Sequence, residues 1–356
     1  MKSFRVIGLM SGTSLDGLDV ADVSFYMSDS EEWSFKLNHS AIYDFDEVLL
    51  GRLKNSFQFS SQELTKLSAD LGRFYAEKVN DFLLKYKTDK SQIDLIASHG
   101  QTIFHQPLQR YTLQIGNGPE LAVDTGLPTV VDFRTKDVAL GGNGAPLIPV
   151  ADHLLFSSYA DTFLNLGGFS NFSFKANNKV LSYDICPVNI VINELMLEIG
   201  LNYDNNGSYG SQGQVNIELF DRLNALPFYS EAGPKSLGWE WVVNSVHPLL
   251  SQDISLKDKV RTLYEHMAFQ IGLSINNSSS TSTLVTGGGA KNHFLIDRIR
   301  SFTNGVIIVP DEDLIDFKEA IGFAFLGLLR WQNKINVWSS VTGSKKDSSS
   351  GVIHLP

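Results

Sequence analysis

The chain has 356 residues, of which 43% are hydrophobic and 19% charged, and its formal net charge at pH 7 is −10. This length allows two domains, and the acidic balance argues against a nucleic-acid partner, which needs clustered lysine and arginine. The single cysteine, Cys186, excludes an internal disulfide and suits a reducing compartment. Because no apolar run reaches the ~18 residues of a membrane span and no signal peptide is evident, the sequence predicts a cytoplasmic location without a membrane partner.

Two strands joined by a small, polar turn are predicted within residues 6–26, and a third strand at residues 33–42. The turn reads SGTSLDG, and its glycines, Gly12 and Gly17, allow positive φ and the close approach of a ligand. Its backbone N–H groups and hydroxyls can converge on an anion, and Asp16 can hold a hydrated divalent cation. The turn therefore predicts a phosphate site, and a tight hairpin without a ligand is the alternative.

An amphipathic helix that opens with a capping-box pattern is predicted over residues 60–82, and its apolar stripe is assigned to the core. The buried strand at residues 93–97 then ends in the polar run SHGQT. Ligands of α/β proteins bind at the carboxyl ends of strands. His99, Gln101 and His105 are therefore candidate substrate contacts, and a turn with internally satisfied histidines is the alternative.

A further strand, residues 129–133, leads into Arg134 and a glycine-rich loop at residues 141–144. A charged strand end before a flexible loop is typical of a site edge or of an interdomain connection. We place the boundary between two domains near residue 136.

The second half repeats the pattern of strand, glycine turn and strand within residues 162–174, with Gly167 and Gly168 in the turn. Two such turns facing each other across a cleft could bind a polyphosphate from both sides, which favours the phosphate interpretation. Asp184 then closes a short strand ahead of a helix. A carboxylate there can act as a general base or orient a nucleophile, and a helix N-cap is the alternative.

Three glycines, residues 287–289, separate a strand at 283–286 from a helix with Asn292 in its first turn. This arrangement lets a flat ring or a phosphate lie against the helix N-terminus, although it matches neither a Walker A loop nor a dinucleotide fingerprint. A helix at residues 317–331 is apolar nearly all round and is predicted to be buried. The Ser-, Gly- and Lys-rich residues 339–351 are predicted to be loosely ordered.

Taken in order, these pieces resemble the anhydro-N-acetylmuramic acid kinases, a branch of the superfamily of sugar kinases, chaperone ATPases and actin. The matching stretches cover nearly the whole chain. They are GLMSGTSLDGLD, SHGQTIFHQP, DFRTKDVALGGNGAPLIP, LNLGGFSN, the segment around Asp184, PKSLG, VTGGGAKN and KEA.

The resemblance implies an α/β fold of two RNase-H-like (actin-like ATPase) domains, with mixed sheets flanked by helices and a nucleotide cleft between them. The implied division is an N-terminal domain over residues 1–135, with helix 313–334 near the interface, a C-terminal domain over 136–312, and a tail over 335–356. It also implies ATP and Mg²⁺ as cofactors, and a reaction of cell-wall recycling. In that reaction water opens the anhydro bridge of 1,6-anhydro-N-acetylmuramic acid while O6 is phosphorylated.

Carried onto this sequence, the resemblance implies Asp184 as the base that activates the water and Asp16 as a metal contact, directly or through water. It implies a substrate site, which we assign to His99, Gln101, Arg134 and Glu319, with Arg134 suited to the lactyl carboxylate. The implied nucleotide contacts are Gly12, Thr13, Ser14, Leu15, Asp16, Gly17, Leu18, Asp19, Gly167, Gly168, Gly287, Gly288, Gly289 and Asn292.

Two segments depart from the family pattern. Ile185 and Val188 replace residues of the Asp-Thr-Gly-Pro-Gly-Asn run, and Leu237 and Trp239 replace a polar and a cationic position after PKS. The sequence therefore leaves open another amino sugar on the same fold, and also an ATP-driven switch of the actin or chaperone type. It likewise leaves open whether the chain forms a homodimer.

Overall fold

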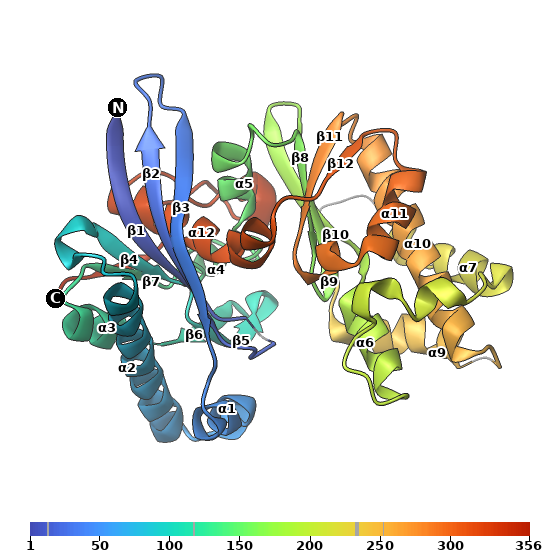
Figure 1. The fold of residues 1–356 in the computed structure, drawn as a ribbon, viewed down its shortest axis with the longest axis horizontal. Helices are drawn as coiled ribbons and strands as arrows, with labels where there is room; N and C mark the ends of the chain where they lie inside the picture. Colours follow the sequence, from blue (N-terminus) through green and yellow to red (C-terminus); the bar gives the residue numbers. More distant parts are fainter. Residues whose placement is uncertain (13, 117, 232–234, 252) are drawn as a thin grey trace. The chain divides into compact units, whose positions relative to one another are not determined.

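The computed structural model describes residues 1–12, 14–116, 118–231, 235–251 and 253–356, which form two compact units (Figure 1). Unit 1 consists of Met1–Phe156 and Phe317–Pro356, and unit 2 of Ser157–Asp316. The predicted boundary near residue 136 lies earlier than this division, because residues 136–156 fold with unit 1. The predicted tail from residue 335 onward also folds with unit 1.

Among the described residues, unit 1 contains a six-stranded mixed sheet with the order β13-β7-β4-β1-β2-β3 and a two-stranded sheet of β5 and β6. β2 is antiparallel to β1 and β3, whereas β4 is parallel to β1 and β7. The strands of unit 1 are β1 Lys2–Met10, β2 Leu18–Met27, β3 Trp33–Tyr43, β4 Leu95–Ser98, β5 Gln101–Gln106, β6 Tyr111–Ile115, β7 Thr129–Val131 and β13 Val352–His354. Its helices are α1 Glu47–Lys54, α2 Ser61–Lys85, α3 Gly118–Thr125, α4 Thr135–Ala139, α5 Pro149–Leu155, α13 Ser339–Thr342 and, from Phe317 onward, α12 Glu312–Trp331.

The amphipathic helix predicted over residues 60–82 is confirmed as α2. Its capping box is complete, because the Glu63 N–H donates to Ser60 Oγ at 3.3 Å and the Ser60 N–H donates to the Glu63 carboxylate at 2.8 Å. Its buried stripe packs in one core with Ile7 and Leu9 of β1. Alternate residues of a strand point to opposite faces, so these two side chains put α2 on one face of the sheet.

The predicted buried helix is confirmed as α12, which packs on the other face of the sheet. A Cβ at Gly8 of β1 would overlap the carbonyl oxygen of Ala320, and a Cβ at Gly327 would overlap the Cβ of Ala97 in β4. Glycine is therefore required at both positions for the helix and the strands to approach so closely. Phe25 of β2 adds a ring contact with Phe325, at a centroid distance of 5.5 Å.

The prediction that residues 339–351 are loosely ordered is wrong. The segment includes α13 and leads into β13, which pairs with β7 in antiparallel register. Asn336 is fully buried and holds both ends of this segment to α12. Its Nδ2 donates to the carbonyl oxygens of Leu326 and Ser350 at 2.9 and 2.8 Å, and its Oδ1 accepts from the Ser350 N–H at 2.7 Å. The prediction failed because composition does not reveal a buried partner.

Unit 2 contains a five-stranded sheet with the order β10-β9-β8-β11-β12. β9 is antiparallel to β8 and β10, and β11 is parallel to β8 and β12. The strands are β8 Thr162–Leu166, β9 Phe169–Ala176, β10 Lys179–Pro187, β11 Ser282–Thr286 and β12 Val306–Ile308. The helices are α6 Asn189–Leu197, α7 Ile217–Asn224, α8 Trp239–Trp241, α9 His247–Leu250, α10 Leu256–Asn277 and α11 His293–Phe302.

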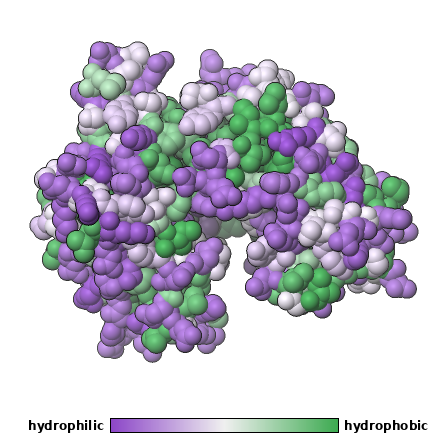
Figure 2. All heavy atoms as spheres, in the orientation of Figure 1, coloured by the Kyte–Doolittle hydropathy of each residue, from purple (hydrophilic) through white to green (hydrophobic). Residues whose placement is uncertain are grey.

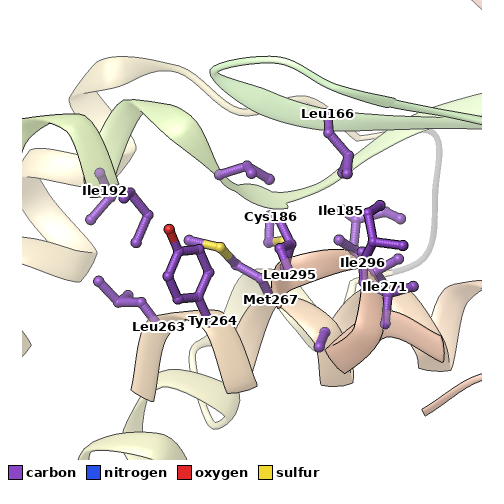
Figure 3. Packing of buried hydrophobic residues seen from close by; sticks show 14 of the residues in the cluster. Leu166, Ile185, Cys186, Ile192, Leu263, Tyr264, Met267, Ile271, Leu295 and Ile296 are labelled. Atoms are coloured by element: carbon purple, nitrogen blue, oxygen red, sulfur yellow. The ribbon is translucent and has the colours of Figure 1, made fainter. Parts of the chain in front are cut away.

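The core of unit 2 lies between its sheet and the helices α6, α10 and α11 (Figure 3). Leu166 and Ile185 from the strands meet Met267 and Ile271 of α10 and Leu295 of α11 there. On the face drawn in Figure 2, hydrophilic residues cover much of the surface, with apolar residues between them. None of the helices in the described ranges combines the length and the apolar character that a membrane crossing requires.

The large sheets of the two units share one strand order. When only the strands of each large sheet are numbered along the chain, the third, second, first, fourth and fifth lie side by side, and the second is antiparallel to its neighbours. In each unit, a glycine-containing turn joins the first two strands. The predicted repetition of strand, glycine turn and strand is therefore confirmed, as is the α/β class with mixed sheets flanked by helices.

Candidate functional site

The turn between β1 and β2 in unit 1 has the strained backbone that its composition predicts, but not at both glycines. Gly17 adopts a φ of +148°, and a Cβ there would lie 2.9 Å from the carbonyl oxygen of Tyr43. The second positive φ, +58°, belongs to Leu15 and not to Gly12. A branched side chain in this region carries a strain of about 1 kcal/mol or more, and such strain clusters at functional sites.

The side chains of this turn differ in what they expose. Asp16 is exposed, and its Oδ1 accepts from Ser14 Oγ at 2.8 Å. Leu18 is buried in the core of unit 1, so that only its backbone is available to a ligand, and Asp19 is half-buried. Thr13, also a predicted contact, lies outside the described residues.

The predicted phosphate turn and the predicted substrate strand are joined by one buried hydrogen bond. Ser11 Oγ at the end of β1 donates to Gln101 Oε1 at the start of β5, at 2.5 Å. Both side chains are almost fully buried, at 2% exposure each. The structure therefore places Gln101 behind the turn as a link to Ser11.

His99 is likewise held by its neighbours within unit 1. Its ring is 4% exposed, its Nδ1 lies 2.8 Å from the Gly100 carbonyl oxygen, and its Nε2 accepts from Arg134 Nε at 2.9 Å. Burial lowers the pKa of His99 well below its usual value, and the charge of Arg134 lowers this pKa further. The ring is therefore neutral, with its proton on Nδ1, and His99 orients Arg134.

Arg134 follows β7 and is oriented by three contacts. Besides His99, its Nη1 donates to the Gly144 carbonyl oxygen at 2.6 Å, and its guanidinium lies 6.0 Å from the Phe323 ring centroid. Burial lowers the pKa of Arg134 to about 10, so the side chain stays charged near neutral pH, while nearby Glu319 opposes the shift. The Nη2 group and one Nη1 proton remain for a carboxylate, which a guanidinium binds in a bidentate manner.

Glu319 on α12 is half-buried and faces a mixed set of charges. Burial raises its pKa, whereas Arg134 and Lys318 act to lower it. Lys318 forms an ion pair with Asp152 of α5 at 2.8 Å, and both of these side chains are buried. His105, also a predicted substrate contact, lies in β5, where partial desolvation of its ring and the charge of Arg134 lower its pKa. Unit 1 thus brings Arg134 and His99 into contact, and it places Glu319 close enough for the two charges of Glu319 and Arg134 to interact.

In unit 2, Asp184 lies near the end of β10 as predicted, but it caps no helix. Its Oδ1 accepts from Asn171 Nδ2 at 3.1 Å, and its Oδ2 accepts from the Leu237 N–H at 2.8 Å. Burial raises the pKa of Asp184, and the hydrogen bonds from Leu237 and Asn171 act in the opposite direction. A half-buried carboxylate with oriented lone pairs has the properties of a general base.

The loop that contacts Asp184 is itself held in place. The Asp184 N–H donates to the Lys235 carbonyl oxygen at 3.0 Å, so the backbone of this loop contacts both the main chain and the side chain of Asp184. Lys235 Nζ donates to the carbonyl oxygens of Phe228 and Glu231 at 2.7 and 3.1 Å, and lies 4.3 Å from the Phe228 ring centroid. Lys235 therefore stabilises the loop, and Trp239 beyond it is 42% exposed.

The two glycine turns of unit 2 lie at the ends of β8 and β11. The Gly167 and Gly168 carbonyl oxygens accept from the Asn189 and Val188 N–H groups at 3.2 and 2.8 Å, which ties the first turn to the start of α6. Gly287 adopts a φ of +81°, and a Cβ there would lie 2.5 Å from Asn165 Oδ1. Gly288 and Gly289 open a short 3₁₀ helix, Gly288–Lys291.

Asn292 is engaged by its own surroundings. Its Oδ1 caps α11 by accepting from the Leu295 N–H at 3.0 Å, and its Nδ2 donates to Tyr264 Oη at 2.9 Å. Tyr264 Oη lies 3.1 Å from Asp204 Oδ2, and Asp204 also accepts from the Gly210 N–H at 2.9 Å. Sequence reasoning missed Asp204 and Tyr264, because no motif links them to the glycine turn.

The fit of a divalent cation rests on Asp16. Mg²⁺ is bound in many phosphate-transfer sites by one or two carboxylates, with water and phosphate oxygens as the other ligands. Among the described residues, no group of three or more His, Cys, Asp or Glu side chains could hold a metal. The exposed carboxylate of Asp16, beside a turn of backbone N–H groups, fits a Mg²⁺ site in which one protein carboxylate is joined by water and phosphate oxygens.

The comparison with known families matches residues 4–356 of the chain to the model described as anhydro-N-acetylmuramic acid kinase. The chain belongs to this family. Relatives named anhydro-N-acetylmuramic acid kinase include one from Pasteurella multocida, 34% identical over 98% of this chain and 96% of the relative, and one from Mannheimia succiniciproducens, 35% identical over 98% of both. One from Sulfurovum is 32% identical over the full length of both chains.

Two solved structures also resemble this anhydro-N-acetylmuramic acid kinase family member, at low sequence identity. A component of (R)-2-hydroxyglutaryl-CoA dehydratase from Acidaminococcus fermentans is 11% identical, with a TM-score of 0.46, and the match covers 91% of this chain and 97% of that one. A ROK family glucokinase from Streptomyces griseus is 10% identical, with a TM-score of 0.41, over 91% of this chain and 99% of that one. The family assignment rests on the sequence comparisons.

Proposed function

We propose that the chain is an ATP-dependent kinase that opens 1,6-anhydro-N-acetylmuramic acid with water and phosphorylates it at O6. The products are N-acetylmuramic acid 6-phosphate and ADP. Family membership over residues 4–356 supports this substrate. The observation that carries the mechanism is the geometry of Asp184, whose two carboxylate oxygens each accept one hydrogen bond and keep lone pairs for water.

In this mechanism Asp184 removes a proton from a water molecule as the water oxygen attacks C1 of the sugar. The C1–O6 bond breaks, O6 attacks the γ-phosphorus of ATP, and the bond to ADP breaks. One water and one phosphoryl group are therefore added to the sugar, and the proton leaves through Asp184. Phosphoryl transfer depends mainly on positioning and charge neutralisation, which backbone N–H donors in glycine turns can supply.

We assign the remaining predicted residues to binding. Arg134, oriented by His99, binds the lactyl carboxylate through its remaining N–H groups, and Glu319 and Gln101 support the sugar site. The nucleotide binds at the residue 12–19 turn, at Gly167 and Gly168, and at residues 287–292. Mg²⁺ would neutralise phosphate charge when bound, and Asp16 would hold it directly or through water. A cytoplasmic location and a homodimer stay predictions.

The test is mass spectrometry of the product after incubation with Mg-ATP and 1,6-anhydro-N-acetylmuramic acid, for the native chain and for Asp184→Asn. We expect a product heavier than the sugar by one phosphoryl group and one water, and its loss in the variant. A product that gains the phosphoryl group without water would contradict ring opening. No product with the anhydro sugar but one with another amino sugar would transfer the proposal to that substrate.

A further inference from the structure

The carboxylate of Asp184 is bound by a side chain that no motif pointed to. Asn171 of β9 and Asp184 of β10 are direct cross-strand partners in the antiparallel register. Side chains of such partners lie on the same face of the sheet, so the Asn171 amide is next to the Asp184 carboxylate. Asn171 Nδ2 donates to Asp184 Oδ1 at 3.1 Å.

The orientation of the Asn171 amide is itself determined by a neighbour. Ser182 Oγ, two residues before Asp184 on β10, lies 3.0 Å from Asn171 Oδ1 and 3.1 Å from the Phe172 carbonyl oxygen, so its single proton is shared between two acceptors, and Ser182 is 2% exposed. When this proton is donated to Asn171 Oδ1, the amide presents its N–H group to Asp184, as the 3.1 Å contact of Nδ2 with Oδ1 of Asp184 shows. A flipped amide would place an oxygen against the carboxylate, which is repulsive when Asp184 is ionised.

We propose that Asn171 is a positioning residue for the general base. It fixes one oxygen of Asp184 while the Leu237 N–H fixes the other at 2.8 Å, and the Ser182 hydroxyl contributes to the direction of the Asn171 amide. The role rests on the proposed function of Asp184 as the base. Its consequence is that Asn171 keeps Asp184 ionised in a partly desolvated position.

Within unit 2, the ionisable groups on the elements next to Asp184 do not compete with this effect. Burial raises the pKa of the Cys186 thiol on β10 to about 12, so this group is neutral near pH 7. The Lys235 ammonium is bound to carbonyl oxygens of its own loop. Tyr183 packs its ring on Phe172 and Phe174, and the one ionisable residue of β9, Lys175, is exposed.

The first experiment is the pH dependence of kcat/KM for the anhydro sugar in Asn171→Ala. A hydrogen bond to an ionised group is strong enough to change proton affinity about tenfold, so we expect the acidic limb to move up by about one pH unit. We expect kcat/KM to fall about tenfold at pH values below both limbs, and the KM for ATP to stay unchanged. Asn171→Asp should move the limb further, because a second negative charge disfavours ionisation of Asp184.

The matched control is Asn277→Ala, an asparagine exposed at the end of α10, which should leave the limb in place. Ser182→Ala offers a second route if Asn171→Ala does not fold, and it should shift the limb in the same direction by less. A limb unchanged in both Asn171→Ala and Ser182→Ala would overturn the proposal.

An independent readout separates this inference from the proposed function. The pKa of Asp184 can be measured by carbon-13 NMR of its carboxyl group, assigned through Asp184→Asn. A higher pKa in Asn171→Ala supports the positioning role even if the native chain does not phosphorylate the anhydro sugar, an outcome that would reject the function alone. An unchanged Asp184 pKa in a folded Asn171→Ala would reject the positioning role even in an active enzyme.

Discussion

Replacing Asn336 with alanine should destabilise unit 1 more than any surface substitution. The side chain is fully buried and makes three hydrogen bonds to backbone groups of Leu326 and Ser350. Alanine would leave one N–H and two carbonyl groups in a buried site without this partner. At roughly 1 kcal/mol for each hydrogen bond, the expected loss in the free energy of unfolding is about 3 kcal/mol.

The assay is thermal and urea unfolding, together with hydrogen exchange of the amides between residues 336 and 354. For a unit of this size, a loss of 3 kcal/mol lowers the melting temperature by roughly 6–12 °C. Asn336→Asp should be as harmful, because an oxygen would replace the Nδ2 donor against two carbonyl groups. Gln62→Ala, an exposed change in α2, is the control. A loss below about 1 kcal/mol in Asn336→Ala would refute the reasoning.

Three further predictions test packing, electrostatics and binding. Gly8→Val should lower the free energy of unfolding by about 2 kcal/mol or more, because its Cβ would overlap the Ala320 carbonyl group, and a fully stable variant would contradict this close approach. Burial raises the pKa of Glu265, but hydrogen bonds from two arginines lower it overall. Its ionised form therefore stabilises unit 2 above pH ~4.3, and the stability difference from Glu265→Gln, measured by urea unfolding, should be present at pH 7 and lost towards pH 3. Arg134→Ala should raise the KM for the anhydro sugar about 30-fold, equivalent to about 2 kcal/mol, and leave the KM for ATP unchanged, while unaltered sugar affinity would remove the assignment.

The sequence predicted the elements of this fold better than their grouping. The first two strands, the long helix α2 and the buried helix α12 have strong local patterns, and the structure contains them. The unit boundary depends on tertiary packing, which places α5 against β3 through the edge contact of Phe156 with Phe35 at 5.1 Å. A glycine-rich loop at residues 141–144 therefore does not end the first unit, although its composition is typical of a linker.

Single residues of the candidate site could be proposed from the sequence, whereas pairs of contacting residues could not. Asp184 follows from its position at a strand end, whereas Asn171 matters only through the register of β9 on β10. His99 was predicted as a direct contact, yet its Nε2 is occupied by Arg134. Side-chain partners far apart in the sequence decide such roles, and a single sequence does not show them.

The lone cysteine has a practical consequence for experiments on this kinase family member. Cys186 is 0% exposed, and burial raises the pKa of its thiol to about 12, so it forms almost no thiolate at neutral pH. Maleimide reagents should therefore pass over the native chain and react only with a cysteine introduced on its surface. One dye on each unit, at Lys66→Cys and Lys175→Cys for example, would then report by energy transfer how the distance between the labels responds to nucleotide and sugar.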